Sequence, residues 1–226
     1  MKMTSYIRAF LKAFISPSKP KKSYSQFSED LLIHFFLRDK STAKYYVDIG
    51  CHHPRRGSNT YLLYKKKWHG LLVDLEPEKV LACSLARPRD KVVLAAVSDR
   101  EQQVDIYSPK HFSTNTTIKI EGLSNQDGYK KIGEIRTKTL NKILDENQVP
   151  KNFGLLSIDV EGVDFDVLKS INLNEYKPRV ICVECWESSE GINAIIEGQI
   201  YKYLTNQGYE LRGWLVLSAI FVRSVD

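Results

Sequence analysis

The sequence lacks three features that would assign the chain to a class directly. No run of about 20 apolar residues occurs, so we expect no membrane-spanning helix. A Gly-x-Gly-x-x-Gly pattern is missing after the first predicted strand, which argues against a nicotinamide-dependent oxidoreductase. A small-residue cleavage site is missing near the N-terminus, so no secretory signal is predicted. The composition, with 27% charged and 42% hydrophobic residues among 226, is typical of one soluble globular domain with a substantial core.

Cysteine is scarce and forms no clear metal or disulfide pattern. The four cysteines are Cys51, Cys83, Cys182 and Cys185. The last two have the spacing of a redox or zinc motif, but they lie in the apolar run 180–185, which predicts a β-strand. Residues three apart on a strand face opposite sides, so this pair cannot share a metal or easily form a disulfide. We interpret the cysteines as small buried hydrophobes in a reducing compartment and expect a cytoplasmic location.

Acidic residues are absent from the first 22 positions. This segment holds six of the 33 basic residues, and the rest of the chain holds 27 residues of each sign. A neutral body argues against a nucleic-acid-binding fold, which would carry a basic face. We therefore divide the chain into a basic N-terminal segment, 1–22, and a domain, 23–226.

The basic segment has two interpretations. Residues 4–15 predict a short amphipathic helix, and the linker at 16–23, with Pro17 and Pro20, ends it. A basic amphipathic helix followed by a polybasic linker could lie on an anionic membrane surface. Alternatively, the helix could dock on the domain while the linker stays in solvent.

Apolar, β-rich runs alternate with helical patterns along the domain. Strands are predicted at 45–49, 70–75, 92–97, 155–158 and 180–185, with helices at 58–67, from Pro77, and at 139–147, 164–171 and 191–206. This alternation predicts a doubly wound α/β sheet. The runs 209–215 and 218–223 have a short connection and should pair antiparallel. Further strands are predicted at 103–107 and 134–138, and the polar segment 108–131 is expected to be an exposed loop, either a substrate lid or mobile.

Acidic residues follow the predicted strands at one edge of the sheet. They are Asp48, Glu76, Asp99, Asp159 and Glu184. Ligands of open α/β sheets bind outside the carboxyl ends of the strands. Gly50 would let the backbone turn sharply there and let a ligand approach, and Glu76 could accept hydrogen bonds from both ribose hydroxyls of a nucleoside. The alternative for each acid is that it caps the following helix, which is the interpretation we prefer for Asp164.

Five motifs in order resemble one family. Val47-Asp48-Ile49-Gly50, Leu75-Glu76-Pro77, Ala96-Val97-Ser98-Asp99, Thr139-Leu140 and Ile158-Asp159-Val160-Glu161-Gly162 are similar to the pattern of FkbM-type S-adenosylmethionine-dependent methyltransferases. The resemblance covers about residues 24–223. It implies the Rossmann-like, doubly wound seven-stranded sheet of class I methyltransferases with an antiparallel last strand. The chain departs from the commoner pattern after Gly50, where Cys51-His52-His53-Pro54 resembles a subgroup with His-His-Pro.

The resemblance also implies roles for individual residues. Asp48 and Gly50 would line the methionine part of S-adenosylmethionine, and Glu76 would hold the ribose. Ser98 and Asp99 would lie near the adenine. We place Cys51, His52 and Asp159 among the cofactor contacts as well.

Methyl transfer to an alcohol needs a group that removes the proton of the acceptor. His52 and His53 are candidates because histidine titrates near neutral pH, and Asp159 is the rival base. A third possibility gathers Asp159, Glu184 and His53 around Mg²⁺ or Mn²⁺, which would lower the pKa of the acceptor. The alternative for the two histidines is that they only anchor their loop by hydrogen bonds.

The function expected from these observations is S-adenosylmethionine-dependent O-methylation. The resemblance implies a sugar hydroxyl of a surface polysaccharide, glycolipid or related metabolite as the acceptor. Alternatives are N- or C-methylation of another small molecule, and a non-catalytic nucleotide-binding partner in a glycan-assembly complex. We expect no nucleic-acid partner and a cytoplasmic protein, which would sit at the inner membrane surface if the basic segment binds lipid.

Overall fold

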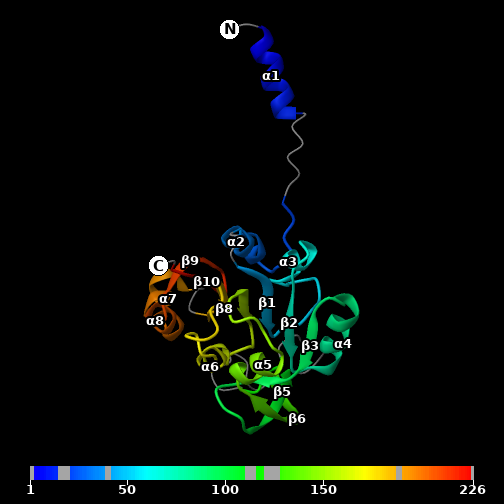
Figure 1. Cartoon of the computed structure of the whole chain (residues 1–226), viewed down its shortest axis with the longest axis vertical. Coiled ribbons are helices and arrows are strands. Elements are labelled where there is room, and N and C mark those ends of the chain that lie inside the picture. The colour runs from blue at the N-terminus through cyan, green and yellow to red at the C-terminus, as the bar shows by residue number, and fades with distance from the viewer. Residues whose placement is uncertain are drawn as a thin grey trace.

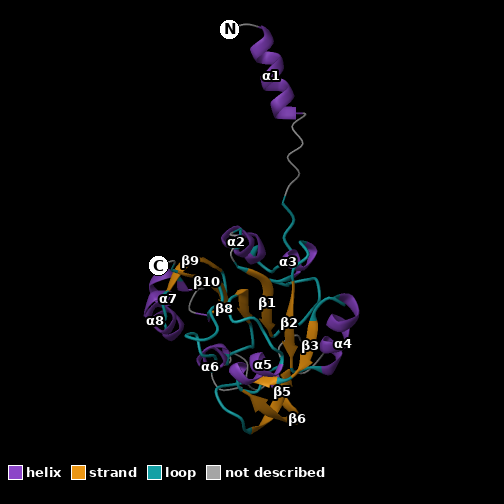
Figure 2. Ribbon diagram, viewed as in Figure 1, coloured by secondary structure: helices purple, strands orange, loops and turns teal. Residues whose placement is uncertain are grey.

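The computed structural model describes residues 3–14, 21–38, 42–109, 116–119, 128–186 and 190–224. Its centre is a seven-stranded sheet in the order β3-β2-β1-β7-β8-β10-β9 (Figures 1 and 2). The strands are β1 Ala43–Ile49, β2 His69–Asp74, β3 Lys91–Leu94, β7 Phe153–Ile158, β8 Val180–Glu184, β9 Tyr209–Leu215 and β10 Ser218–Arg223. The first five are parallel, and β10 pairs antiparallel with both β8 and β9. The predicted fold is confirmed, including the antiparallel last strand.

Helices cover both faces of this sheet. They are α2 Glu29–Phe36, α3 Tyr61–Lys65, α4 Pro77–Ala86, α5 Leu140–Glu146, α6 Asp164–Lys169, α7 Ile192–Glu197 and α8 Gln199–Asn206. The first three contribute to one hydrophobic cluster, and the other four contribute to the second. The predicted helix 191–206 is two helices, because Gly198 between α7 and α8 has extended backbone dihedrals and interrupts the turn.

The alternation of side chains along the strands explains the two clusters. On β1, Val47 and Ile49 face the cluster of α5 to α8, whereas Tyr46 faces that of α2 to α4. Cys182 and Cys185 fall in opposite clusters, so the prediction that they face opposite sides is confirmed. The body of each strand is thereby anchored on two faces, and its carboxyl end is left at one edge of the sheet.

A second, three-stranded sheet, β4-β6-β5, corrects one predicted strand. The run 92–97 splits into β3 and the short β4 Ala96–Val97, which pairs with β6 Tyr129–Lys138. β6 also pairs antiparallel with β5 Gln103–Pro109. The split occurs because the chain leaves the main sheet after β3 to join β6, which a continuous apolar run cannot reveal.

The polar segment 108–131 is described only in part. Residues 110–115 and 120–127 of this predicted loop lie outside the described residues. The prediction that this segment is an exposed loop is wrong for the part that the structure describes. Thr116 and Thr117 are buried, Thr117 pairs with Tyr107, and its hydroxyl donates a hydrogen bond to the carbonyl oxygen of Glu161 at 3.0 Å. This part of the segment therefore packs beside the end of β7.

The N-terminal helix α1, Met3–Phe14, lies apart from the other helices and strands (Figure 1). It begins and ends within one residue of the predicted limits, and none of its residues is buried. Within the described ranges, no helix is both long and apolar enough to cross a bilayer.

Candidate active site

A cavity of about 590 Å³ opens at the carboxyl ends of β1, β2, β7 and β8. Six of the predicted site residues line it, namely Asp48, Gly50, Cys51, His52, Asp159 and Glu184. The cavity thus lies where open α/β sheets bind their ligands. Its size is within the range of small-molecule and cofactor sites.

Gly50 joins the ends of β1 and β7. Its backbone has φ +81°, a left-handed conformation that glycine adopts without strain. A side chain at this position would collide with the carbonyl oxygen of Asp159. The Asp159 N–H donates to the carbonyl oxygen of Ile49 at 3.0 Å, and the Gly50 N–H donates to that of Val73 at 2.9 Å. Only glycine allows three strand ends to meet this closely.

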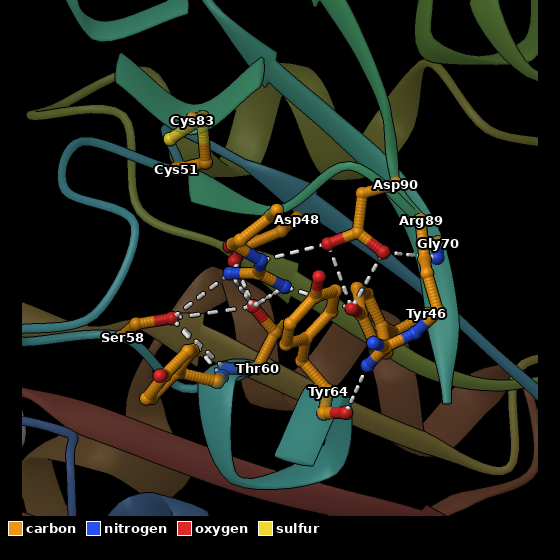
Figure 3. A network of polar contacts seen from close by, with 12 residues as sticks. Tyr46, Asp48, Cys51, Ser58, Thr60, Tyr64, Gly70, Cys83, Arg89 and Asp90 are labelled. Carbon is orange, nitrogen blue, oxygen red and sulfur yellow. Dashed lines mark hydrogen bonds and ion pairs between the residues drawn. The ribbon is translucent and has the colours of Figure 1, made fainter. Parts of the chain in front are cut away.

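Asp48 is buried and is held by hydrogen bonds rather than left as a free carboxylate. The Thr60 hydroxyl donates to Asp48 Oδ2 at 2.6 Å, and both terminal nitrogens of Arg87 donate to the same hydroxyl oxygen at 3.0 and 3.1 Å (Figure 3). Burial raises the pKa of Asp48, whereas the hydrogen bond from Thr60 and the Arg87 charge lower it. The carboxyl group is therefore fixed in orientation at the cavity wall.

Arg87 belongs to a fully buried ion pair behind this carboxyl group. Its Nε donates to Asp90 Oδ2 at 2.7 Å, and neither side chain is exposed. The Tyr46 hydroxyl donates to both Asp90 oxygens at 2.8 Å and accepts from Arg87 at 2.8 Å. The Gly70 N–H adds a further bond to Asp90 at 2.9 Å (Figure 3). The sequence analysis missed this network, because its members lie far apart in the chain.

Asp74 is the acid at the end of β2, two positions before the predicted Glu76. Its carboxylate accepts from the His52 N–H at 2.9 Å and from the Glu76 N–H at 3.0 Å. It therefore fixes the loop after Gly50 against the loop after β2. Glu76 itself forms an ion pair with Lys79 at 2.6 Å, and Lys79, not Glu76, is among the cavity-lining residues. The position of Asp74 at the carboxyl end of β2 could have identified it as a site residue.

Two carboxyl groups, Asp159 and Glu184, face the cavity from β7 and β8. Burial and the nearby charge of Asp159 raise the pKa of Glu184 to about 9. The pKa of Asp159 is also raised well above its ordinary value, by burial and by nearby carboxyls, of which Asp164 contributes most. The Asp159 side chain is open to water in the cavity, so burial contributes less than it would in a sealed site. Burial and the neighbouring carboxyls both raise the pKa of Asp159.

The loop that follows Asp159 is shaped by Asp164. Its carboxylate accepts from the N–H groups of Val160 at 3.0 Å and Gly162 at 3.1 Å. The prediction that Asp164 caps the following helix is wrong, because Val163 is the N-cap of α6 and the Asp164 carboxylate binds the N–H groups of the preceding loop instead. Glu161 lies between Val160 and Gly162 in this loop, has φ +55° and lines the cavity. The sequence analysis did not select it as a site residue. Burial and the Asp164 charge raise its pKa.

The two histidines differ in their surroundings. His52 lines the cavity with φ +46°, and its Nδ1 is buried without a hydrogen-bond partner in the described structure. Burial and the Lys79 charge lower its pKa, so the ring is neutral near pH 7. His53 Nδ1 instead accepts from the N–H groups of Arg55 and Arg56, each at 3.0 Å. His53 therefore anchors its loop, as the alternative interpretation expected, and is not among the cavity-lining residues.

The predicted metal site is not formed. Asp159, Glu184 and His53 do not converge, and no group of three His, Cys, Asp or Glu side chains in the described ranges could hold a metal ion. The physical reason is that His53 Nδ1 is used to fix its own turn, while the two carboxyls lie on other strand ends.

Ser98 and Asp99 lie outside the cavity wall as described. They follow β4, which belongs to the second sheet, and Asp99 is exposed. Ala95 and Val97 line the cavity in their place, as small apolar groups. The adenine contacts at Ser98 and Asp99 are implied by the family resemblance and stay a prediction.

Further lining residues come from segments that carry no motif. Gln26 lies before α2, Asn59 lies before α3, and Trp186 follows β8. Cys51 also lines the cavity, and its Sγ lies 3.7 Å from that of Cys83 on α4 (Figure 3). Both cysteines are free and buried, in agreement with their interpretation as small buried groups.

Comparison with known proteins gives one family match. The model of the "Methyltransferase FkbM domain" matches residues 48–211. A search of curated proteins found no match. Among solved structures, a TehB-like SAM-dependent methyltransferase from Corynebacterium glutamicum is 12% identical, with a TM-score of 0.44 over 98% of this chain and 96% of that one. A proposed caffeoyl-CoA O-methyltransferase from Staphylococcus aureus is 12% identical, with a TM-score of 0.47 over 99% and 93%.

The family model matches the part of the chain that forms the cavity. The matched residues include Asp48, Gly50, Asp159 and Glu184 at the cavity. The match covers more than half of the chain. The chain therefore belongs to the FkbM methyltransferase family, and it is an S-adenosylmethionine-dependent methyltransferase.

Proposed function

We propose that the protein methylates a hydroxyl group of a sugar, in a surface polysaccharide, glycolipid or related metabolite. The observation that carries this proposal is the pair Asp159 and Glu184. These two carboxyls share the cavity with Asp48 and Gly50, and their pKa values are raised. A carboxyl group with a raised pKa is a stronger base when ionised, which suits a poorly acidic alcohol.

The cavity suits S-adenosylmethionine in size and polarity. When bound, this cofactor supplies a methyl group on a positively charged sulfur. Asp48 and Asp159 provide negative charge at the cavity wall, which favours a sulfonium. His52 Nδ1 is buried without a partner and offers a hydrogen bond to a ligand. In this proposal Asp48 and Gly50 contact the methionine part, and Glu76 reaches the ribose by exchanging its bond to Lys79.

Asp159 is the group that we propose to accept the proton of the hydroxyl. Because the pKa of Glu184 is about 9, Glu184 is protonated near neutral pH and can donate a hydrogen bond. A neutral neighbour leaves Asp159 more easily ionised than it would be beside a second carboxylate. The hydroxyl proton passes to the Asp159 carboxylate as the oxygen takes the methyl group. His52 is the second candidate base, since its ring is neutral and lines the same cavity.

The lining residues also suit a sugar. Trp186 lines the cavity beside Glu184, and Asn59 and Gln26 add amide groups. Pyranose rings present an apolar face to an aromatic ring and hydroxyls to polar side chains at the edge, the mixed surface that such sites offer. The Cys51-His52-His53-Pro54 sequence would mark a subgroup in which His52 replaces a cofactor contact of the commoner pattern.

The test measures methyl transfer from S-adenosylmethionine to a panel of sugars, with matched N- and C-nucleophiles in the same panel. We expect transfer to a sugar hydroxyl. Asp159→Asn should lower turnover at least about 100-fold, the usual scale for losing a general base, and leave the affinity for the demethylated cofactor product, which carries no sulfonium charge, within about threefold. The matched control is Asp166→Asn, since Asp166 is an aspartate on α6 paired with Lys169 at 3.0 Å and outside the cavity.

The outcomes separate the candidate functions. Transfer only to nitrogen or carbon acceptors would assign the protein to N- or C-methylation. Cofactor binding without transfer to any acceptor would favour a non-catalytic nucleotide-binding partner. Full turnover of Asp159→Asn together with a large loss in His52→Ala would move the base to His52.

A further inference from the structure

We propose that helix α1 binds the surface of an anionic membrane. The proposal does not depend on the acceptor of the methyl group. It rests on the distribution of apolar and basic side chains on α1 and on the absence of any buried residue in this helix.

The apolar side of α1 is unusually complete for a helix in water. Its large apolar side chains are all exposed, and they are Met3, Tyr6, Ile7, Phe10, Leu11 and Phe14. At 100° per residue they fall on one continuous side of the helix. Phe10 and Phe14 also contact each other, with ring centroids 4.8 Å apart. An exposed apolar surface formed by this many large side chains indicates an interaction site.

The polar side of α1 is narrow and positive. It holds Thr4, Ser5, Arg8 and Lys12, with the two basic residues one turn apart. Lys19, Lys21 and Lys22 follow in the sequence, and no acidic residue occurs before position 23. An apolar side bordered by basic residues lies in the plane of an anionic bilayer, with the aromatic rings among the acyl chains and the cations at the headgroups.

Charge decides between a membrane and a second copy of the chain. A helix pair across the apolar side would cover that side but leave Arg8 and Lys12 of both copies on the outer faces, with no acidic residue of the segment to neutralise them. The remainder of the chain is neutral overall, so the whole net charge of +6 is carried by residues 1–22. Anionic lipid neutralises this charge and covers the apolar side at the same time.

The experiment is co-sedimentation of the full chain with vesicles. One set contains phosphatidylcholine alone, and the other contains phosphatidylcholine mixed with the anionic lipid phosphatidylglycerol. We expect at least about tenfold stronger binding to the anionic vesicles, weakened by added salt. Ile7→Glu with Phe10→Glu should reduce this binding at least about tenfold. Arg8→Gln with Lys12→Gln should reduce the preference for anionic lipid, because these are two of the six basic residues in the segment.

The matched control is Leu85→Glu. Leu85 is 76% exposed on α4, so the change places the same acid on an exposed apolar position outside α1. This variant should bind like the wild type. Equal binding of the wild type and the Ile7→Glu, Phe10→Glu variant would overturn the proposal. So would equal binding to neutral and anionic vesicles, or a dimer in sedimentation velocity that the same variant dissociates.

Discussion

Replacing Arg87 tests whether the buried ion pair supports both the fold and the site. Arg87→Met removes a guanidinium with no exposed surface and leaves the Asp90 carboxyl buried with bonds from Tyr46 and Gly70 only. Breaking a buried pair by removing one partner costs about 3–5 kcal/mol. For a urea slope of about 2–3 kcal/mol per M, the unfolding midpoint should fall by about 1–2.5 M.

A double-mutant cycle assigns this loss to the pair. Asp90→Asn alone leaves the Arg87 charge uncompensated and should also cost about 3–5 kcal/mol. The double variant contains neither charge of this pair, so its loss should be smaller than the sum of the two by about 2–3 kcal/mol. Urea unfolding followed by circular dichroism measures all four proteins. Asp90→Asn within about 1 kcal/mol of the wild type would refute the reasoning, because Asp90 would then be neutral in the folded protein.

Three further predictions concern the cavity. Gly50→Ala should destabilise the protein and abolish cofactor binding in calorimetry. The reason is that the added methyl group collides with the Asp159 backbone and that position 50 has a positive φ. Normal binding would show that the strand ends can separate. The pKa of Glu184 is raised above its unfolded value, so the folded state keeps a proton that the unfolded state loses, and stability should fall as pH rises from about 5 to 9. Glu184→Gln should make urea midpoints less dependent on pH in this window, and an unchanged slope would contradict this. Glu76→Ala should weaken cofactor binding by about 1–3 kcal/mol in calorimetry, and unchanged affinity would exclude a ribose contact.

The sequence by itself determined the architecture. Alternating apolar runs and helical patterns predicted the doubly wound sheet, and the short connection at 216–217 predicted the antiparallel pair β9 and β10. These features follow from local periodicity and turn length, which do not depend on distant partners. The same periodicity placed Cys182 and Cys185 on opposite faces, and Thr139 at the start of α5, where its hydroxyl accepts from the Lys142 N–H. The acidic residues that follow the predicted strands likewise indicated which edge of the sheet holds the cavity.

Tertiary structure alone decided which side chains act at that edge. Ser98 and Asp99 follow β4, which joins the second sheet, and His53 Nδ1 accepts hydrogen bonds from the turn that follows it. Asp74 lies nearer the cavity than Glu76, since strand β2 ends at Asp74. Arg87 lies 39 positions after Asp48, and Thr60 connects the two only once α3 and α4 pack on the sheet. Periodicity fixes the face of a residue, but the polar partner on that face is set by segments that only folding brings together.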